Sequence, residues 1–354
     1  MYRTQLMLWL IILALGFWAF GARLKVPPGV RFSVIATLYA ALILAHLVLP
    51  AQHPLILATG GSVAPLALLG GFIGLILIYR LGLRALRGRA ERTQTAGGDT
   101  PGQTDTFNNT ELERYARHIM LREIGGVGQK NFKQAKILVI GAGGLGAPAL
   151  QYLAASGVGT IGVIDDDLVE NSNLQRQVIH QDAAIGTPKV FSAQTMMLAQ
   201  NPYIEIRPYH RRFTKDIAAE LCAEFDLLLD GSDNFDTRYL ANETAVVLGM
   251  PLISGALSQW EGQVAVFDPK TFGPCYACVF PSAPAAGLAP SCAEAGVFAP
   301  LPGVVGAIMA AEALKLLSDA GTALRGHMLI YDALYGETRK LKMTPRTDCP
   351  ICGG

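Results

Sequence analysis

The chain has 354 residues, of which 51% are hydrophobic and 16% charged. That charged fraction lies well below the roughly 25% of an ordinary soluble domain, so we expect part of the chain to lie in a membrane. Residues 1–90 hold eight Lys and Arg and no Asp or Glu, whereas the remainder holds 21 basic and 28 acidic residues. This composition excludes a disordered chain and a small disulfide-stabilised scaffold, and it argues against a wholly soluble one-piece enzyme.

Three uncharged apolar runs predict a membrane anchor, residues 1–87, with three transmembrane helices at about 4–21, 32–50 and 63–79. As helices these runs reach about 26–29 Å, close to the roughly 30 Å of a hydrocarbon core. A buried core helix is the alternative for each run, but three runs with no acidic residue between them favour membrane helices. For the first run a cleaved signal peptide is a further alternative.

The basic residues predict the orientation of the anchor. The N-terminus has one basic residue, Arg3. The first connection and the segment after the third run together have eight Lys and Arg residues: Arg23, Lys25, Arg31, Arg80, Arg84, Arg87, Arg89 and Arg92. By the positive-inside rule we expect the N-terminus outside and the rest of the chain on the cytoplasmic side of the inner membrane. Residues 88–109 are polar and rich in Gly and Thr, which is typical of a flexible linker.

After this linker, the predicted strands and helices alternate. A capping-box pattern, Thr110 with Glu113, predicts a helix to about Ile124. Strands are expected at 136–140, 160–164, 204–208, 225–229, 251–254 and 263–267. Helices are expected after the first strand to about residue 156 and at 189–199, 237–248 and 304–317, and a hairpin is expected at 328–343. This order predicts an α/β fold of Rossmann type, a doubly wound and mostly parallel sheet within one domain, 110–354.

A glycine-rich loop follows the first of these strands, and acidic residues follow the second. The residues are Gly141, Gly143, Gly144 and Gly146, then Asp165 and Asp167. Glycine lets a backbone approach phosphate, a helix N-terminus offers N–H groups to the anion, and Asp165 is placed to accept from a ribose hydroxyl. The motif by itself fits NAD and ATP about equally, and a tight turn that binds no ligand is the alternative.

Polar residues at later strand ends favour ATP. Arg176 follows the acidic strand end, Lys189 begins the next helix, and Asp233 with Asn234 follows a buried strand. Two fixed cations suit a triphosphate whose charge shifts as pyrophosphate leaves, and a carboxylate suits Mg²⁺. Each residue alone is more often an exposed charge or a helix cap, but together they favour ATP with Mg²⁺.

Four of the six cysteines form two C-x-x-C pairs, Cys275 with Cys278 and Cys349 with Cys352. Two such pairs are typical of a structural tetrahedral Zn²⁺ site, here in the C-terminal region with one ion per chain; a redox dithiol is the alternative. Cys222 lies in an apolar helix and is expected to pack. Cys292 lies in a loop rich in Pro, Ala and Gly, as either a nucleophile or an incidental thiol.

Together these motifs resemble the HesA/MoeB/ThiF family, relatives of the ubiquitin-activating enzymes that adenylate the C-terminal glycine of a small carrier protein. The resemblance covers about 110–354 and is carried by 114–117, 141–146, 165–167, 172–177, 188–189, 232–234, both C-x-x-C pairs and 292–296. It implies a nucleotidyltransferase that uses ATP and Mg²⁺, contains zinc and forms a homodimer.

The resemblance also implies roles for single residues. ATP and Mg²⁺ would be held by the glycine loop, Asp165, Asp167, Lys189, Asp233, Asn234 and the run Ser172, Asn173, Leu174, Gln175 and Arg176. Arg117 would reach the phosphates of ATP in the partner subunit, and Cys292 would occupy the thiol position above the channel for the carrier tail. The candidate catalytic residues are therefore Arg117, Arg176, Lys189, Asp233 and Cys292.

Within the family, residues 261–263 and 295–300 are more similar to the MoeB branch, the molybdopterin-synthase adenylyltransferases, whereas the ending 352–354 is equally similar to ThiF. The expected substrate is the Gly-Gly terminus of a ubiquitin-like sulfur carrier for molybdenum cofactor biosynthesis, with the thiamine-pathway carrier as alternative. We identify no rhodanese-like region, so a separate sulfur donor of cysteine desulfurase or rhodanese type is expected. An NAD-dependent oxidoreductase and a catalytically idle membrane scaffold are alternatives of other classes; no nucleic-acid partner is expected.

Overall fold

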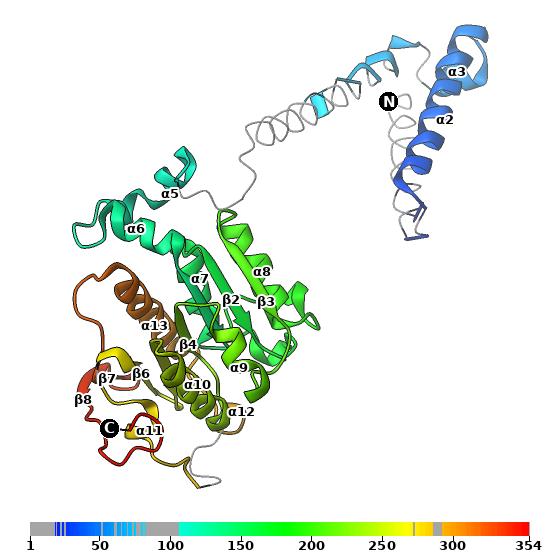
Figure 1. Ribbon diagram of the computed structural model, residues 1–354. Helices are drawn as coiled ribbons and strands as arrows, with labels where there is room; N and C mark the ends of the chain where they lie inside the picture. The colour runs from blue at the N-terminus through cyan, green and yellow to red at the C-terminus, as the bar shows by residue number, and fades with distance from the viewer. Residues whose placement is uncertain are drawn as a thin grey trace. The chain divides into compact units, whose positions relative to one another are not determined.

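The computed structural model describes residues 106–271, 273–285 and 292–353, together with 26–50, 52–59 and short stretches and single positions elsewhere between 18 and 82. The chain separates into two units, 1–99 and 100–354. In Figure 1 the N-terminal unit is coloured blue to cyan and the C-terminal unit teal to red.

The N-terminal unit contains the apolar helix α2 (Pro28–Val48) and the short helix α3 (Pro54–Ala58). Among the described residues two helices are long and apolar enough to cross a membrane, Gly29–Val48 and Pro300–Ser318. The first corresponds to the predicted run 32–50, and the second is a core helix of the C-terminal unit. The prediction of three membrane helices is therefore not confirmed, because run 4–21 lies mostly outside the described residues and run 63–79 is described only in part.

The C-terminal unit is built on one eight-stranded sheet, in the order β3-β2-β1-β4-β5-β6-β7-β8. Five strands run parallel: β1 (Lys136–Ile140), β2 (Thr160–Ile164), β3 (Glu205–Tyr209), β4 (Leu227–Asp230) and β5 (Leu252–Leu257). Three pair antiparallel: β6 (Glu261–Phe267), β7 (His327–Asp332) and β8 (Glu337–Lys342). The sheet is thus mixed. Its parallel part agrees with the prediction, and it becomes antiparallel from β6 onward, because a tight turn joins β5 to β6 where a parallel pairing would need a crossover.

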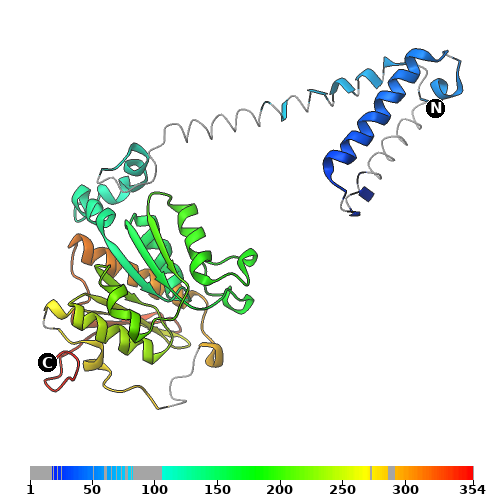
Figure 2. The ribbon, with the colours of Figure 1, turned by 45° about the vertical axis from the view of Figure 1, so that its right-hand side comes forward.

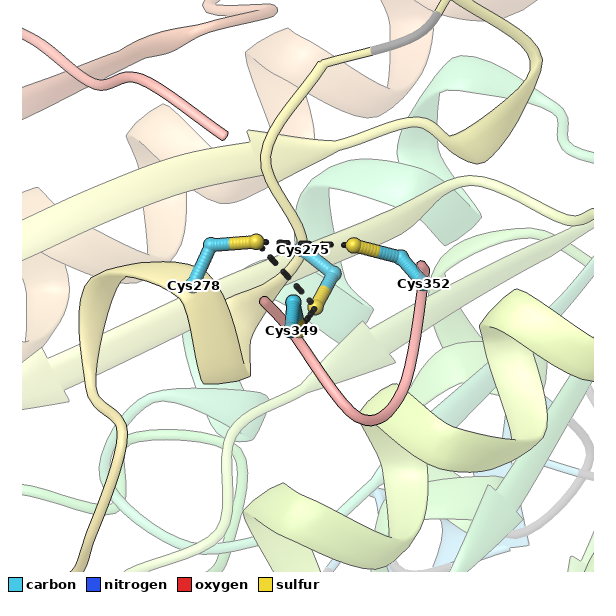
Figure 3. Close-up of side chains that lie close together, drawn as sticks. All are labelled: Cys275, Cys278, Cys349 and Cys352. Carbon is cyan, nitrogen blue, oxygen red and sulfur yellow. Dashed lines mark hydrogen bonds between the residues drawn. The ribbon is translucent and has the colours of Figure 1, made fainter. Parts of the chain in front are cut away.

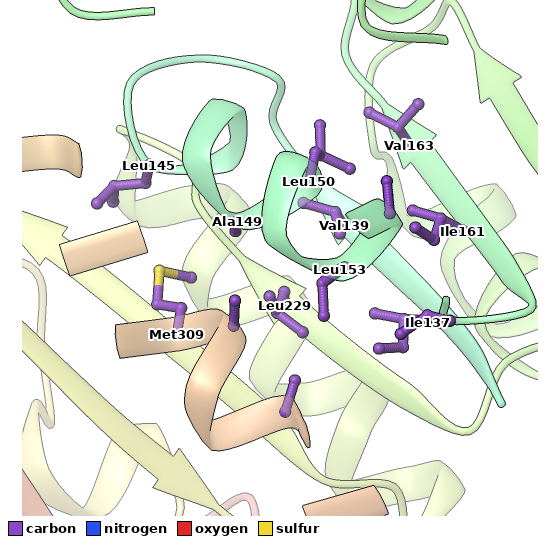
Figure 4. Close-up of a cluster of buried hydrophobic side chains, with 14 of the residues drawn as sticks. Ile137, Val139, Leu145, Ala149, Leu150, Leu153, Ile161, Val163, Leu229 and Met309 are labelled. Carbon is purple, nitrogen blue, oxygen red and sulfur yellow. The ribbon is translucent and has the colours of Figure 1, made fainter. Parts of the chain in front are cut away.

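Helices cover both faces of the parallel strands, as predicted for a doubly wound fold (Figures 1 and 2). One face carries α7 (Gly146–Ser156), α8 (Lys189–Gln200) and α13 (Pro300–Ser318), and the other carries α9 (Lys215–Cys222) and α10 (Phe235–Leu248). Figure 4 shows the first core, where Leu150 and Leu153 of α7 lie near Val139 of β1 and Leu229 of β4. Short turns complete the unit: η1 (Asn171–Asn173), η2 (Asp182–Ala184), η3 (Pro269–Thr271), α11 (Tyr276–Val279) and α12 (Cys292–Ala295).

Strand β1 lies at the centre of this arrangement. Its residues alternate between the cores, with Ile137 and Val139 in the first and Leu138 and Ile140 in the second. A strand buried on both faces needs apolar residues at successive positions, which is the pattern its sequence has. The chain continues from β1 to β2 on one side, whereas β4 lies on the other, so the carboxyl ends of β1 and β4 flank the topological switch point.

The first helix differs from the prediction. α5 (Asn109–Ile119) begins at a capping box of Asn108 with Glu111, in place of Thr110 with Glu113. Asn108 Oδ1 accepts the N–H of Glu111 at 2.9 Å, and Glu111 Oε2 accepts the N–H of Asn108 at 3.0 Å. The buried ion pair of Glu111 with Lys133, at 2.8 Å, favours this frame. The helix ends at Ile119, and a separate helix, α6 (Gly125–Gln134), follows the turn.

Candidate functional site

A cleft of about 800 Å³ opens where the parallel strands end. Its volume lies within the roughly 300–1,000 Å³ typical of small-molecule sites, and it includes the switch point. The predicted site residues that line it are Gly141, Gly143, Gly144, Asp165, Asp167, Arg176, Lys189, Asp233 and Asn234. Residues predicted from separate motifs therefore meet in one cavity.

The glycine loop packs closely on itself. A Cβ atom at Gly146 would lie 1.8 Å from the carbonyl oxygen of Gly141, and Gly141 has a φ of +92°. Larger residues at these two positions would force the loop open, because one lacks space and the other needs a left-handed backbone. Gly144 and Leu145, at the start of α7, line the cleft, so the positive end of this helix dipole faces it.

A buried histidine supports the loop. His180 Nε2 lies 2.9 Å from the carbonyl oxygen of Ala142, and His180 Nδ1 lies 2.9 Å from Ser192 Oγ. A carbonyl oxygen only accepts, so Nε2 carries the proton and Nδ1 accepts from the Ser192 hydroxyl. Desolvation by burial lowers the pKa of His180. The neutral imidazole therefore satisfies both of its partners.

Asp165 ties the glycine loop to the end of β2. Its Oδ2 accepts the N–H of Ala142 at 2.7 Å, and its Oδ1 accepts the N–H of Asp167 at 2.8 Å. Burial raises the pKa of the Asp165 carboxyl, and the positive charge of Lys189 partly opposes that rise. Because each carboxylate oxygen has more than one lone pair, the group can also accept from a ligand hydroxyl.

Two cations are positioned by neighbouring groups. Lys189 Nζ lies 2.6 Å from Asp167 Oδ2, and only 6% of the lysine side chain is exposed. Arg176 Nη1 donates to the carbonyl oxygen of Ser172 at 3.1 Å, so the turn η1 holds the guanidinium. The described lining of the cleft does not include four residues of the predicted run: Ser172, Asn173, Leu174 and Gln175. Their observed contribution is to shape the turn that presents Arg176.

A buried ion pair underlies the loop after β4. Arg238 Nη1 lies 3.4 Å from Asp230 Oδ2 and donates to the carbonyl oxygen of Gly255 at 2.7 Å. Asp230 Oδ1 also accepts from the N–H and the hydroxyl of Ser232. Since both charges are buried and paired, the loop has a fixed anchor on β4 and β5.

This anchored loop leads to Asp233 and Asn234. Asp233 is exposed in the cleft, where its carboxylate can meet a cation. Asn234 Oδ1 accepts the N–H of Thr237 at 2.9 Å and is the N-cap of α10. The side chain of Asn234 therefore has a structural role, in addition to its place in the lining.

Three arginines that the sequence patterns did not single out also line the cleft, Arg211, Arg212 and Arg238, together with Gln177 from the motif 172–177. Arg211 and Arg212 follow β3, so the rule that ligands bind at strand carboxyl ends could have identified them. Arg117 lies exposed in the last turn of α5 and is absent from the described lining of its own cleft. The side chain of Cys292 lies outside the described residues, so its role stays a prediction.

The four cysteines of the two C-x-x-C pairs point toward one another (Figure 3). Their Sγ atoms are separated by 3.9 Å for Cys275 and Cys278, 3.6 Å for Cys275 and Cys349, and 3.4 Å for Cys278 and Cys352. A disulfide needs about 2.05 Å, whereas thiolates around tetrahedral zinc, with bonds of about 2.3 Å, lie about 3.8 Å apart. The cluster therefore fits a closed structural zinc site, in agreement with the prediction from spacing.

Cys222 behaves as an ordinary core residue. It is fully buried in the second core, and burial raises the pKa of its thiol to about 12. A thiol with that pKa stays protonated at neutral pH and is a poor nucleophile or ligand. The expectation that Cys222 packs is confirmed.

Comparisons with known proteins agree with this site. The ThiF family model matches residues 115–351. The sulfur carrier protein adenylyltransferase of Thermus thermophilus is 51% identical over 251 residues, 70% of this chain and 93% of that protein. The SAMP-activating enzyme E1 of Haloferax volcanii is 48% identical over 250 residues, 71% of this chain and 92% of that protein.

The match to a third relative covers a smaller share of that protein. The probable adenylyltransferase/sulfurtransferase MoeZ of Mycobacterium tuberculosis is 48% identical over 231 residues, 64% of this chain and 59% of that protein. Among solved structures, E. coli MccB with MccA-N7isoASN has a TM-score of 0.62 at 23% identity, covering 70% of this chain and 76% of that one, which shows a shared fold. The chain therefore belongs to the ThiF family, and the prediction of a nucleotidyltransferase is confirmed.

Proposed function

We propose that this enzyme adenylates the C-terminal glycine of a small ubiquitin-like sulfur carrier, with magnesium ATP as the second substrate. The observation that carries the proposal is that one cleft contains the glycine loop, Asp165, Arg176, Lys189 and Asp233. These groups suit the phosphates, the ribose, the developing negative charge and Mg²⁺ of such a nucleotide. The names of the Thermus and Haloferax relatives, a sulfur carrier adenylyltransferase and an activating enzyme, support the same reaction.

The order of the strands suggests how the nucleotide lies. The phosphates would lie on the glycine loop after β1, and the ribose would lie at Asp165 after β2. Because β3 is the next strand in the sheet, the base would then point toward the end of β3. Arg211 and Arg212 line the cleft there. A planar guanidinium stacks well on an aromatic ring, so these arginines would cover a face of the adenine.

In the reaction, an oxygen of the carrier's terminal carboxylate attacks the α-phosphorus of ATP. A bond forms between that oxygen and phosphorus, and the bond from the α-phosphorus to its bridging oxygen breaks as pyrophosphate leaves with the electron pair. The carboxylate is already anionic, so no general base is needed and positioning supplies much of the rate. Arg176 and Lys189 would stabilise the charge on the phosphates, and Asp233 would hold Mg²⁺.

We propose the small subunit of molybdopterin synthase as the carrier, with the thiamine-pathway carrier as the alternative. The proposal relies on the two segments that resemble the MoeB branch, 261–263 and 295–300. The turn before β6 contacts the second segment directly, since Gln259 Nε2 donates to the carbonyl oxygen of Ala295 at 2.6 Å and Phe298 donates its N–H to Gln259. The turn that leads into the first segment therefore contacts the second, and Gln263 of the first segment lines the cleft.

We further propose a homodimer in which Arg117 acts on the nucleotide of the partner subunit. Met120, which follows α5, is 74% exposed, and Val127 on α6 is 76% exposed, and such apolar side chains suit burial against a second copy. A zinc ion in the cysteine cluster would have a structural role, since four thiolates leave no open position.

The N-terminal unit would anchor the enzyme on the cytoplasmic side of the inner membrane. A separate donor would supply sulfur to the adenylated carrier.

The proposal is tested by ATP–pyrophosphate exchange with each purified carrier. We expect exchange with the molybdopterin-synthase small subunit and little with the thiamine-pathway carrier. The reverse preference would contradict the carrier assignment, and no exchange with either would contradict the reaction. A nicotinamide-dependent absorbance change with the purified enzyme would instead support the oxidoreductase alternative.

A further inference from the structure

Helix α10 connects the cleft to the cysteine cluster. It begins at its N-cap Asn234, next to Asp233, and carries Asn242 about two turns later. Asn242 is 1% exposed and has no part in the proposed reaction. A carboxamide buried this deeply needs partners for its polar atoms, and the cysteine loop supplies them.

Asn242 contacts two successive residues of that loop. Its Nδ2 lies 3.6 Å from Cys275 Sγ, and its Oδ1 accepts the N–H of Tyr276 at 2.8 Å. The second contact fixes the orientation of the carboxamide, because a backbone N–H only donates and must face the oxygen. The NH₂ group of Asn242 is therefore the group that faces the sulfur of Cys275.

An N–H group in that position suits a metal-bound thiolate. A cysteine bound to zinc is deprotonated, and a donor to an anionic sulfur forms a charge-assisted hydrogen bond. We propose that Asn242 is a positioning residue for the metal centre, which donates to the Cys275 thiolate and holds the backbone of Tyr276 so that the loop is preformed for zinc. This proposal is independent of the carrier and of the adenylation reaction.

The same contact joins the metal centre to the wall of the cleft. The ring of Tyr276 lines the cleft and packs against Tyr239 and Phe280, at centroid distances of 5.4 and 4.8 Å. Asn242 thus holds the backbone of a residue that lines the cleft. Asn242 therefore contacts both the cysteine cluster and a residue of the cleft wall.

The test compares Asn242→Asp with Asn242→Ala in the full-length protein, by the rate of zinc transfer to a chelating dye. Asn242→Asp keeps the size and an acceptor for Tyr276 but places a carboxylate against the thiolate. We expect Asn242→Asp to release zinc at least about tenfold faster than the wild-type protein. We expect a smaller increase in the release rate for Asn242→Ala, because water can donate to the sulfur in place of the carboxamide. Thr244→Val is the control, because Thr244 is buried on the same helix and its hydroxyl bonds to Leu240.

The proposal would be overturned if Asn242→Ala released zinc faster than Asn242→Asp. That order is expected if Asn242 only fills space, because the truncation then disturbs the packing more than the change to Asp does. A second readout uses Asn242→Ala by itself, with Co²⁺ in place of zinc. The thiolate-to-cobalt charge-transfer band should move to lower energy, because a thiolate without the N–H donor is more easily oxidised. An unchanged band would also overturn it. Neither readout involves ATP or a carrier, so failure of the proposed adenylation would leave both results interpretable.

Discussion

The imidazole of His180 is hydrogen-bonded to the carbonyl of Ala142, with 2.9 Å between Nε2 and the oxygen, so a titratable side chain holds the glycine loop from its buried side. Burial lowers the pKa of His180 below its usual value of 6.5. Between these two pKa values the unfolded chain binds a proton that the folded chain does not. The free energy of unfolding should therefore fall as the pH is lowered through about 6.5, and level off below the folded-state pKa.

Urea unfolding between pH 8 and pH 5 measures this dependence. His180→Gln, whose amide can still donate to Ala142, should be less stable at pH 8 but should vary less with pH between about 6.5 and 5. Wild-type protein and His180→Gln showing the same slope against pH would refute the assignment to His180.

Arg176 should be essential for the chemical step. Arg176→Ala removes a cation from the cleft but leaves the turn η1, so the fold should persist while the exchange rate falls by about 10²–10³. Arg122→Ala is a matched control, because the Arg122 side chain is 93% exposed and pairs only with its neighbour Glu123 among the described residues. Equal exchange rates for the two variants would exclude a role for Arg176 in stabilising the transition state.

The cysteine cluster should bind one zinc ion per chain. Cys275→Ser should lose the metal and much of the stability of the C-terminal unit, because metal binding contributes folding free energy directly. Cys222→Ala removes an equally buried thiol outside the cluster and should keep its zinc. Elemental analysis and thermal unfolding of the two variants provide the comparison. A full complement of zinc in Cys275→Ser would show that the site is elsewhere.

Arg117 is absent from the described lining of its own cleft, so the proposed homodimer predicts complementation between subunits. Arg117→Ala and Asp233→Ala should each be inactive as homodimers. When they are co-expressed, half of the dimers are mixed, and each mixed dimer has one site with its own Asp233 and the partner's intact Arg117. Activity should then recover to roughly a quarter of the wild-type value if pairing is random. No recovery would mean that Arg117 acts within its own chain or not at all.

The strands near the cleft could be predicted well because burial dictates their composition. β1 and β2 have the predicted bounds, since a strand covered on both faces carries a continuous apolar run. Helix α6 was missed because its sequence, from Gly125 to Gln134, contains three glycines and little apolar periodicity. Its formation depends on tertiary packing, as the complete burial of Phe132 shows.

Site residues could be predicted where their type and spacing indicate one kind of site. They could not be predicted where the role of a residue depends on contacts with distant parts of the chain. The spacing of the four cysteines was sufficient to predict their cluster. The functions of Arg238 and Asn242 depend on contacts with residues distant in sequence, Gly255 and Cys275, and no local pattern encodes these. The capping box was misplaced because two overlapping patterns fit, and only the contact of Glu111 with Lys133 distinguishes them.

The most direct test of the central claim is mass spectrometry of the carrier after incubation with the enzyme and magnesium ATP. We predict a carrier whose mass has increased by one adenylyl group, with one pyrophosphate released for each carrier modified. A carrier lacking its terminal glycine, or enzyme with Asp233→Ala, should give no such product. ATP binding to the enzyme without any adenylated carrier, for every Gly-Gly carrier tried, would contradict the account.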